Sequence, residues 1–165
     1  MDALFVRVDE RLLHGQVTLG WASSLQPQVL LLANDRFAED PVQRRLYAEM
    51  RTDDFMVRIE DVDAAGRFLQ ENPQAATQTL VVVETAADAR ALRHAGAPVM
   101  HVNLGGLYQQ QGRRRLVDYV WLSDADIDSL QSLVQEGVEV EARDVPSTPA
   151  LAVDAMTLER IRHKV

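Results

Sequence analysis

Short apolar runs alternate along this chain with longer segments of helical periodicity, and this alternation is the feature that most restricts its fold. The runs at residues 29–33 and 80–83 are continuously apolar, which is typical of strands buried on both faces of a sheet. Repeated strand–helix–strand units favour a parallel sheet that carries helices on both faces. We therefore predict an α/β fold: a single open, mainly parallel sheet with helices on both faces and a short antiparallel edge strand near the C-terminus.

Strand and helix candidates follow one another over the whole chain. We expect strands at residues 4–8, 29–33, 55–59, 80–83, 99–104, 119–122 and 138–142, the last of them at an edge. We expect helices at residues 15–24, 40–50, 61–70, 85–93, 123–136 and 154–164, several of which begin at Asp, Ser or Thr. No internal repeat or linker interrupts this order, so residues 1–165 are predicted to form a single domain.

Charge and composition exclude several classes of function. The formal net charge of −8 argues against nonspecific nucleic-acid binding. The one basic run, at residues 113–115, is interpreted as a solvated loop, and docking of this run against an acidic partner protein stays open. Cysteine is absent, which fits a reducing compartment. No apolar run approaches the roughly 20 residues of a membrane span, and the N-terminus lacks a signal core, so we expect a cytoplasmic protein without membrane insertion.

One segment concentrates the reactive side chains: Arg7-Val8-Asp9-Glu10-Arg11-Leu12-Leu13-His14-Gly15-Gln16-Val17. It lies between the first expected strand and the first expected helix, at the sheet end where ligands usually bind. A neutral imidazole at His14 can attack a phosphoryl group. A helix that begins near Gly15 offers backbone N–H groups to phosphate, and glycine allows the backbone to approach closely.

Four charged residues surround His14 in this segment. Arg7 and Arg11 can make charge-assisted contacts to phosphoryl oxygens, and Asp9 or Glu10 can orient an arginine or the imidazole. These parts suit phosphoryl transfer, in which positioning and charge stabilisation do most of the work. From local chemistry alone, a solvated or structural histidine remains an open alternative.

The other histidines give no sign of a metal site. His94 stands at an expected helix end, His101 lies in an expected strand, and His163 is close to the C-terminus. No two histidines have the i, i+4 spacing of a metal-binding helix, and no phosphate loop of the Walker type is present. We therefore predict no metal, no cofactor and no nucleotide hydrolysis.

The segment around His14, with Trp21 after it, closely resembles the active loop of the mannose/sorbose-family IIB component of the bacterial sugar phosphotransferase system (PTS). The usual pattern in that family is Arg-Ile-Asp-Asp-Arg-Leu-Ile-His-Gly-Gln-Val. Further similarities occur at Ala33-Asn34-Asp35, Asn103-Leu104-Gly105-Gly106-Leu107, Asp126, Gly137-Val138-Glu139-Val140 and Val145-Pro146-Ser147. The resemblance therefore covers nearly the whole chain.

The resemblance implies an open α/β domain that acts as a protein-N(pi)-phosphohistidine–sugar phosphotransferase. A IIA component donates a phosphoryl group to Nδ1 of His14, and the group then passes to a sugar bound by membrane IIC and IID components. Arg11 is expected to bind the phosphoryl group, with support from Arg7, Asp9, Gly15 and Gln16. The expected rim of the site is Asn34, Asp35, Gly105 and Gly106. Such a chain works in the cytoplasm, at the membrane only through IIC and IID, and self-association is known in the family.

The chain departs from the family pattern in three places. Glu10 replaces the second Asp of the pattern, residues 49–54 replace an Ala-x-Pro-like segment, and the run at 113–115 is unusually basic. Two alternatives stay open from the sequence. One is a regulatory phosphocarrier with the same His14 chemistry and no sugar transport. The other is a noncatalytic α/β module that binds an anion in the same loop.

Overall fold

The strands of the computed structural model, which describes residues 3–164, agree closely with the apolar runs of the sequence. They are β1 (Phe5–Asp9), β2 (Val29–Ala33), β3 (Met56–Glu60), β4 (Thr79–Val83), β5 (His101–Gly106), β6 (Arg114–Val117), β7 (Val120–Leu122), β8 (Glu139–Ala142) and β9 (Leu151–Ala152). Met1 and Asp2, the first residues of the N-terminus that was expected to lack a signal core, lie outside the described residues.

Helical segments connect most of these strands. They are η1 (Gln16–Trp21), α1 (Ala22–Leu25), α2 (Asp35–Glu39), α3 (Pro41–Ala48), α4 (Val62–Glu71), α5 (Pro73–Ala76), α6 (Ala86–His94), α7 (Asp124–Gln135) and α8 (Ala155–Arg162). The expected helix at 15–24 is present and starts at Gly15, and η1 within it has the wider turns of a π-helix. Among the described helices, none has the length and apolar character needed to cross a bilayer.

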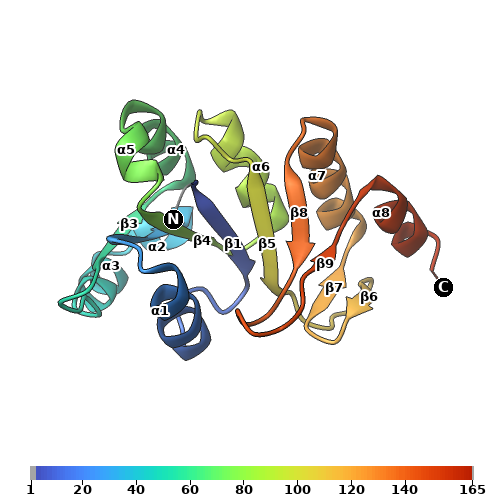
Figure 1. Ribbon diagram of the computed structural model, residues 1–165, viewed down its shortest axis with the longest axis horizontal. Helices are drawn as coiled ribbons and strands as arrows, with labels where there is room; N and C mark the ends of the chain where they lie inside the picture. Colours follow the sequence, from blue (N-terminus) through green and yellow to red (C-terminus); the bar gives the residue numbers. More distant parts are fainter. Residues whose placement is uncertain (1–2, 165) are drawn as a thin grey trace.

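The described strands form one seven-stranded sheet in the order β3-β2-β4-β1-β5-β8-β9, and β6 pairs with β7 in a separate antiparallel hairpin (Figure 1). Every pair in the large sheet is parallel except β8 with β9. The predicted mainly parallel α/β fold is therefore confirmed. The expectation that residues 138–142 form the edge was wrong, because β8 lies between β5 and the two-residue strand β9, which is the antiparallel edge.

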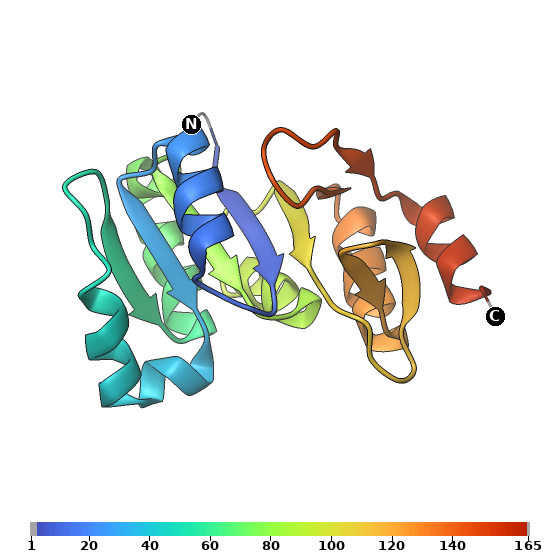
Figure 2. The same cartoon turned by 90° about the horizontal axis from the view of Figure 1, so that it is seen from below.

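Helices cover both faces of the sheet (Figure 2). On one face, α4, α6, α7 and α8 bury alternate strand residues, including Val6, Val81 and Val102. On the other face, η1, α1 and the segment from α2 to Met50 pack on the opposite set, including Leu30, Leu80 and Val82. The strands are thus apolar on both sides, which explains their continuous apolar runs.

Helix ends carry the expected caps. The side chains of Asp40, Asp61, Thr85 and Asp154 accept backbone N–H groups at the starts of α3, α4, α6 and α8, and Ser123 forms a capping box with Asp126 at the start of α7. Gly96 and Gly137 have φ angles of 109° and 86°, the left-handed conformation that ends a helix.

The connections of β1 and β5 leave these neighbouring strands in opposite directions. The chain passes from β1 to β2 on one side, and from β5 through β6, β7 and α7 to β8 on the other. In open α/β sheets, ligands bind at the carboxyl ends of such a strand pair. These ends lie together at the lower edge of the sheet in Figure 1, and the segment that carries His14 begins there.

Candidate functional site

The carboxylate of Asp9, at the end of β1, is the centre of the site. It is fully buried and accepts hydrogen bonds from Arg7 Nη2 at 2.9 Å and from the backbone N of Arg11 at 3.0 Å. Arg11 Nε and Nη2 each lie 3.2 Å from it, one on each oxygen, and His14 Nε2 lies 3.0 Å from Oδ2. One buried carboxylate therefore orients two arginines and the imidazole.

The two ring nitrogens of His14 have different partners. Nε2 faces the Asp9 carboxylate, whereas Nδ1 accepts the backbone N–H of Gln16 at 3.3 Å. These partners assign the ring proton to Nε2 and leave Nδ1 unprotonated, with its electron pair accepting the Gln16 N–H. Burial lowers the pKa of His14 below its ordinary value, although the Asp9 carboxylate acts in the opposite direction. The imidazole is therefore a neutral nucleophile at neutral pH, and its side chain is 18% exposed.

A tight turn brings His14 back over the end of β1. The backbone N of Leu12 donates to Asp9 O at 2.9 Å, and Leu12 has a φ of 57°, which is uncommon for a leucine. Leu12 and Leu13 are both buried in the core beneath η1, so their burial holds this conformation. The helical segment then starts at Gly15, as expected, directly after the imidazole.

Arg7 is a fully buried arginine whose contacts are internal. Besides Asp9, its Nη1 donates to Asn103 Oδ1 at 2.7 Å and to the carbonyl of Arg143 at 3.1 Å. Burial lowers the pKa of Arg7, while the Asp9 carboxylate opposes that effect. The expectation that Arg7 contacts phosphoryl oxygens directly does not fit this geometry, because its guanidinium is enclosed. Its place favours the supporting role, in which it fixes Asp9.

Gly105 and Gly106 form the floor under Arg7 and Asp9. They were expected to follow their strand, but both lie within β5, where the pairing with β1 shifts register between Val8 and Asp9. A Cβ at Gly105 would overlap the guanidinium of Arg7. A Cβ at Gly106 would lie 2.8 Å from Asp9 Oδ1. These glycines therefore make room for the buried ion pair.

Arg11 is the arginine of this cluster that reaches solvent. Its side chain is 39% exposed and bonds to Asp9 and to Gln16 Oε1. Its guanidinium also lies 5.2 Å from the centre of the Tyr108 ring. Arg11 is thus placed beside His14 with an open side, which is what a phosphoryl ligand requires.

Asn34 and Asp35 make their contacts outside the His14 cluster, and their place at its rim stays a prediction. Asn34 caps α2 and donates to Glu84 Oε2 at 2.8 Å, while Asp35 accepts the backbone N of Val62 at 2.9 Å. The reason is the strand order, because β4 separates β2 from β1.

The basic run at residues 113–115 is not a solvated loop, since Arg114 and Arg115 lie in β6. Arg113 is only 13% exposed, and its Nη1 lies 2.5 Å from Glu10 Oε1. Glu10 and this run are two of the three departures from the family pattern, and the structure brings them into contact. The sequence held one sign of this contact, because Glu10 and the run at 113–115 both depart from the family pattern.

Tyr108, Trp21 and Asn103 also belong to the neighbourhood of the site, although sequence reasoning gave them no role. The guanidinium carbons of Arg7 and Arg143 lie 5.5 and 5.6 Å from the centre of the Trp21 ring. Asn103 and Trp21 could have been found from the sequence, because both stand in the motifs that resemble the family.

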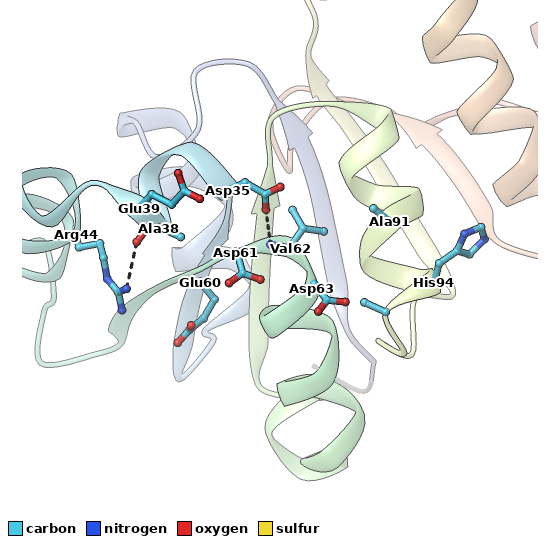
Figure 3. A pocket seen from close by; sticks show the side chains of 11 residues that line it. Asp35, Ala38, Glu39, Arg44, Glu60, Asp61, Val62, Asp63, Ala91 and His94 are labelled. Carbon is cyan, nitrogen blue, oxygen red and sulfur yellow. Dashed lines mark hydrogen bonds between the residues drawn. The ribbon is translucent and has the colours of Figure 1, made fainter.

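A hollow on another part of the described surface lacks the chemistry of a phosphoryl site. The hollow of about 680 Å³ in Figure 3 is lined by residues of α2, α3 and α6 and of the segment from the end of β3 into α4. Five of its lining residues are acidic: Asp35, Glu39, Glu60, Asp61 and Asp63. Its acidic lining would repel a phosphoryl group. Within the described residues, no cluster of three or more His, Asp or Glu side chains is suited to hold a metal ion. A neutral nucleophile beside an open arginine therefore occurs at His14, on an accessible surface.

Comparison with known proteins gives one consistent result. The family model described as "PTS system sorbose subfamily IIB component" matches residues 3–164. The N-acetylgalactosamine-specific phosphotransferase enzyme IIB component 2 of Escherichia coli (strain K12) is 33% identical over 147 residues, which cover 88% of this chain and 92% of that protein. The mannose-specific EIIAB component of the same strain is 26% identical over 145 residues, which cover 88% of this chain but only 45% of that protein.

A solved structure agrees with these relatives. The IIBSor domain of the sorbose permease from Klebsiella pneumoniae superimposes with a TM-score of 0.83 at 26% identity, covering 100% of this chain and 99% of that chain. The likeness therefore extends over the whole fold.

Proposed function

The chain belongs to the sorbose subfamily of PTS IIB components, and from this membership we propose that it is a phosphocarrier that holds its phosphoryl group on His14. It takes the group from a phosphohistidine of a IIA component and passes it to a sugar bound by membrane IIC and IID components. Components of this family are phosphotransferases, and the proposal adds the residue and the order of transfer.

One observation supports the assignment of His14: its two ring nitrogens have different hydrogen-bond partners and therefore different protonation. Asp9 contacts Nε2, and Nδ1 accepts the backbone N–H of Gln16 at the start of the helical segment. The unprotonated nitrogen is thus the one beside the positive end of the helix, where a phosphoryl group is stabilised. The other histidines stand elsewhere: His94 and His163 pair with exposed carboxylates, and His101 faces Glu141 from the start of β5, the opposite end of that strand from the site.

The first transfer step follows from this geometry. Nδ1 of His14 attacks the phosphorus, the N–P bond of the donor breaks, and its electron pair returns to the donor imidazole. His14 keeps its Nε2 proton, so the phosphorylated ring carries a positive charge that the Asp9 carboxylate stabilises at 3.0 Å. Arg11 neutralises the phosphoryl oxygens from its open side.

The second step reverses the first. A sugar hydroxyl oxygen attacks the phosphorus, the bond to Nδ1 breaks with its electrons returning to the ring, and the hydroxyl proton is released to water. His14 is then neutral again and ready for another donor. An accessible histidine suits this cycle because it must meet two partners in turn, in contacts of modest area.

The partners are part of the proposal. The name of the mannose-specific EIIAB relative, of which this chain spans 45%, combines the designations IIA and IIB. This combination supports a IIA component as the direct donor. We propose that residues 1–165 form one domain that works in the cytoplasm and reaches the membrane only through IIC and IID.

The test is phosphorylation of the purified chain by phosphoenolpyruvate, the general phosphotransferase proteins and a IIA component. We expect one phosphohistidine, mapped to His14, with ³¹P NMR showing the Nδ1 form. His14→Gln is expected to abolish labelling, whereas His94→Gln is the matched control and keeps it. Labelling of another residue, or persistent labelling of His14→Gln, would refute the proposal.

A further inference from the structure

Tyr108, two residues after β5, is held at both polar groups of its backbone by side chains. Its N–H donates to Glu10 Oε2 at 3.0 Å, and its carbonyl accepts from Arg113 Nη1 at 2.9 Å. The same Arg113 nitrogen lies 2.5 Å from Glu10 Oε1. Glu10 and Arg113 therefore form a clamp that closes on the Tyr108 backbone from two sides.

This clamp is more enclosed than the ion pairs of the neighbouring arginines. Glu10 and Arg113 are both largely buried, and Arg113 Nε lies 3.8 Å from Asp126, which is fixed in the capping box of α7. Arg114 instead pairs with an exposed carboxylate, that of Asp124. Exposed pairs contribute little, whereas enclosed pairs with several hydrogen bonds fix geometry.

The ring of Tyr108 lies against the exposed arginine of the site. The Arg11 guanidinium is 5.2 Å from the ring centre, and a Cβ on Gly106 would lie 3.0 Å from the Tyr108 hydroxyl. The ring therefore extends over Gly106 beside the Asp9 carboxylate. Asp9 holds Arg11 at Nε and Nη2, Gln16 Oε1 accepts from the same Nη2, and Tyr108 lies against the face of the guanidinium. Among the described residues, Nη1 is then the nitrogen that stays open to a ligand.

We propose that Tyr108, held in place by the Glu10–Arg113 clamp, is a positioning residue that presents the Arg11 guanidinium to the phosphoryl group on His14. This inference rests on the proposed function. An arginine with a free rotamer would have to be ordered during each transfer, whereas an arginine held between a carboxylate and a ring is ordered beforehand.

The test uses a small phosphoryl donor, phosphoramidate, so that partner docking does not enter the rate. The Nδ1 lone pair attacks its phosphorus, the N–P bond breaks, and ammonia leaves with that electron pair and takes up a proton. We expect Tyr108→Leu to lower the saturated rate of His14 phosphorylation about tenfold, because the face of Arg11 loses its support. Tyr108→Phe keeps the ring and is expected to restore most of the rate.

The clamp is tested separately. Arg113→Gln is expected to lower the same rate to a similar extent, and Arg114→Gln, in the same basic run, is the matched control at the wild-type rate. The ¹H–¹⁵N signal of Arg11 Nε reports the position of the guanidinium directly. We expect it to shift in Tyr108→Leu and Arg113→Gln, and to keep its wild-type position in Arg114→Gln.

Two results would overturn the inference. One is a wild-type rate in folded Tyr108→Leu; the other is a slow Tyr108→Leu whose Arg11 signal has not moved. If Tyr108→Leu fails to fold, Arg113→Gln decides by the same two measurements. A wild-type chain that takes no label on His14 would instead refute the proposed function, so the two failures are distinguishable.

Discussion

Asp9 Oδ2 lies 3.0 Å from His14 Nε2, and the same oxygen accepts a hydrogen bond from the buried Arg7 at 2.9 Å. The carboxylate that orients the imidazole is thus itself fixed by a cation that solvent does not reach. Burial alone would raise the pKa of Asp9, but hydrogen bonds from Arg11 and His14 and the charge of Arg7 keep it below its ordinary value. Asp9 therefore stays ionised throughout the range in which His14 titrates.

Asp9→Asn is expected to reduce phosphoryl acceptance by at least about 100-fold. The amide can donate to Nε2, which would move the ring proton to Nδ1 and remove the attacking electron pair. The variant also leaves buried Arg7 without a carboxylate, which should destabilise the fold by about 3–5 kcal/mol. Stopped-flow or quench-flow phosphorylation and urea unfolding measure the two effects.

The control for this variant is Asp118→Asn. Asp118 pairs with Arg115 at an exposed position, so both acceptance and stability should stay close to those of the wild type. An Asp9→Asn protein that accepts phosphate within twofold of the wild-type rate would show that the carboxylate does not select the tautomer.

The titration of His14 should have a midpoint below its ordinary pKa of 6.5, because burial disfavours the imidazolium. Phosphoryl acceptance should therefore persist as the pH falls to 6.5 and decline only below it. As the pH falls below 6.5, His14 takes up a proton in the unfolded chain before it does so in the folded chain. The free energy of unfolding therefore falls as the pH decreases from 6.5 to the folded midpoint. In His14→Gln this part of the slope should disappear. NMR titration of the imidazole nitrogens measures the midpoint, and a value above 6.5 would contradict the prediction.

Much of the fold was predictable because its signals are local. Continuous apolar runs at β2 and β4 reflect burial on both faces, and capping residues such as Asp40 and Thr85 act within their own turn. The five-residue helix α2 and the polar strand β6 were missed, since neither is long enough or apolar enough to produce a periodic pattern.

The site was predictable where one contiguous segment builds it. Arg11 and His14 both contact Asp9 and follow it by two and five residues, so their cluster follows from the sequence order. The positions of Asn34 and Tyr108 depend on strand order and on side chains distant in sequence. The insertion of β4 between β1 and β2 separates Asn34 from the cluster, and the Glu10–Arg113 pair places Tyr108 in it.

Gln26→Gly is expected to stabilise the protein by about 1 kcal/mol. Gln26 follows α1 with a φ of 50°, and its side chain is exposed, so glycine removes backbone strain and loses few contacts. Ser24→Gly, an exposed position inside the same helix, is the control and should destabilise by about 0.5–1 kcal/mol. Thermal and urea unfolding measure the stability of the wild type, Gln26→Gly and Ser24→Gly. Equal changes in stability, in the same direction, for the two variants would contradict the role of the left-handed backbone at Gln26.

Gly105→Ala should destabilise the protein by about 3 kcal/mol or more, because the added methyl group occupies the space of the Arg7 guanidinium. Arg7 cannot move away without leaving Asp9, so the effect should also reach His14. We expect the ¹⁵N shifts of its imidazole to move toward those of a mixed tautomer. Gly20→Ala is the matched control, since a Cβ there meets Pro146 at an ordinary 3.6 Å and should stabilise the helix by about 0.5–1 kcal/mol. A Gly105→Ala protein with wild-type stability and unchanged His14 shifts would mean that Arg7 does not fix the Asp9 carboxylate.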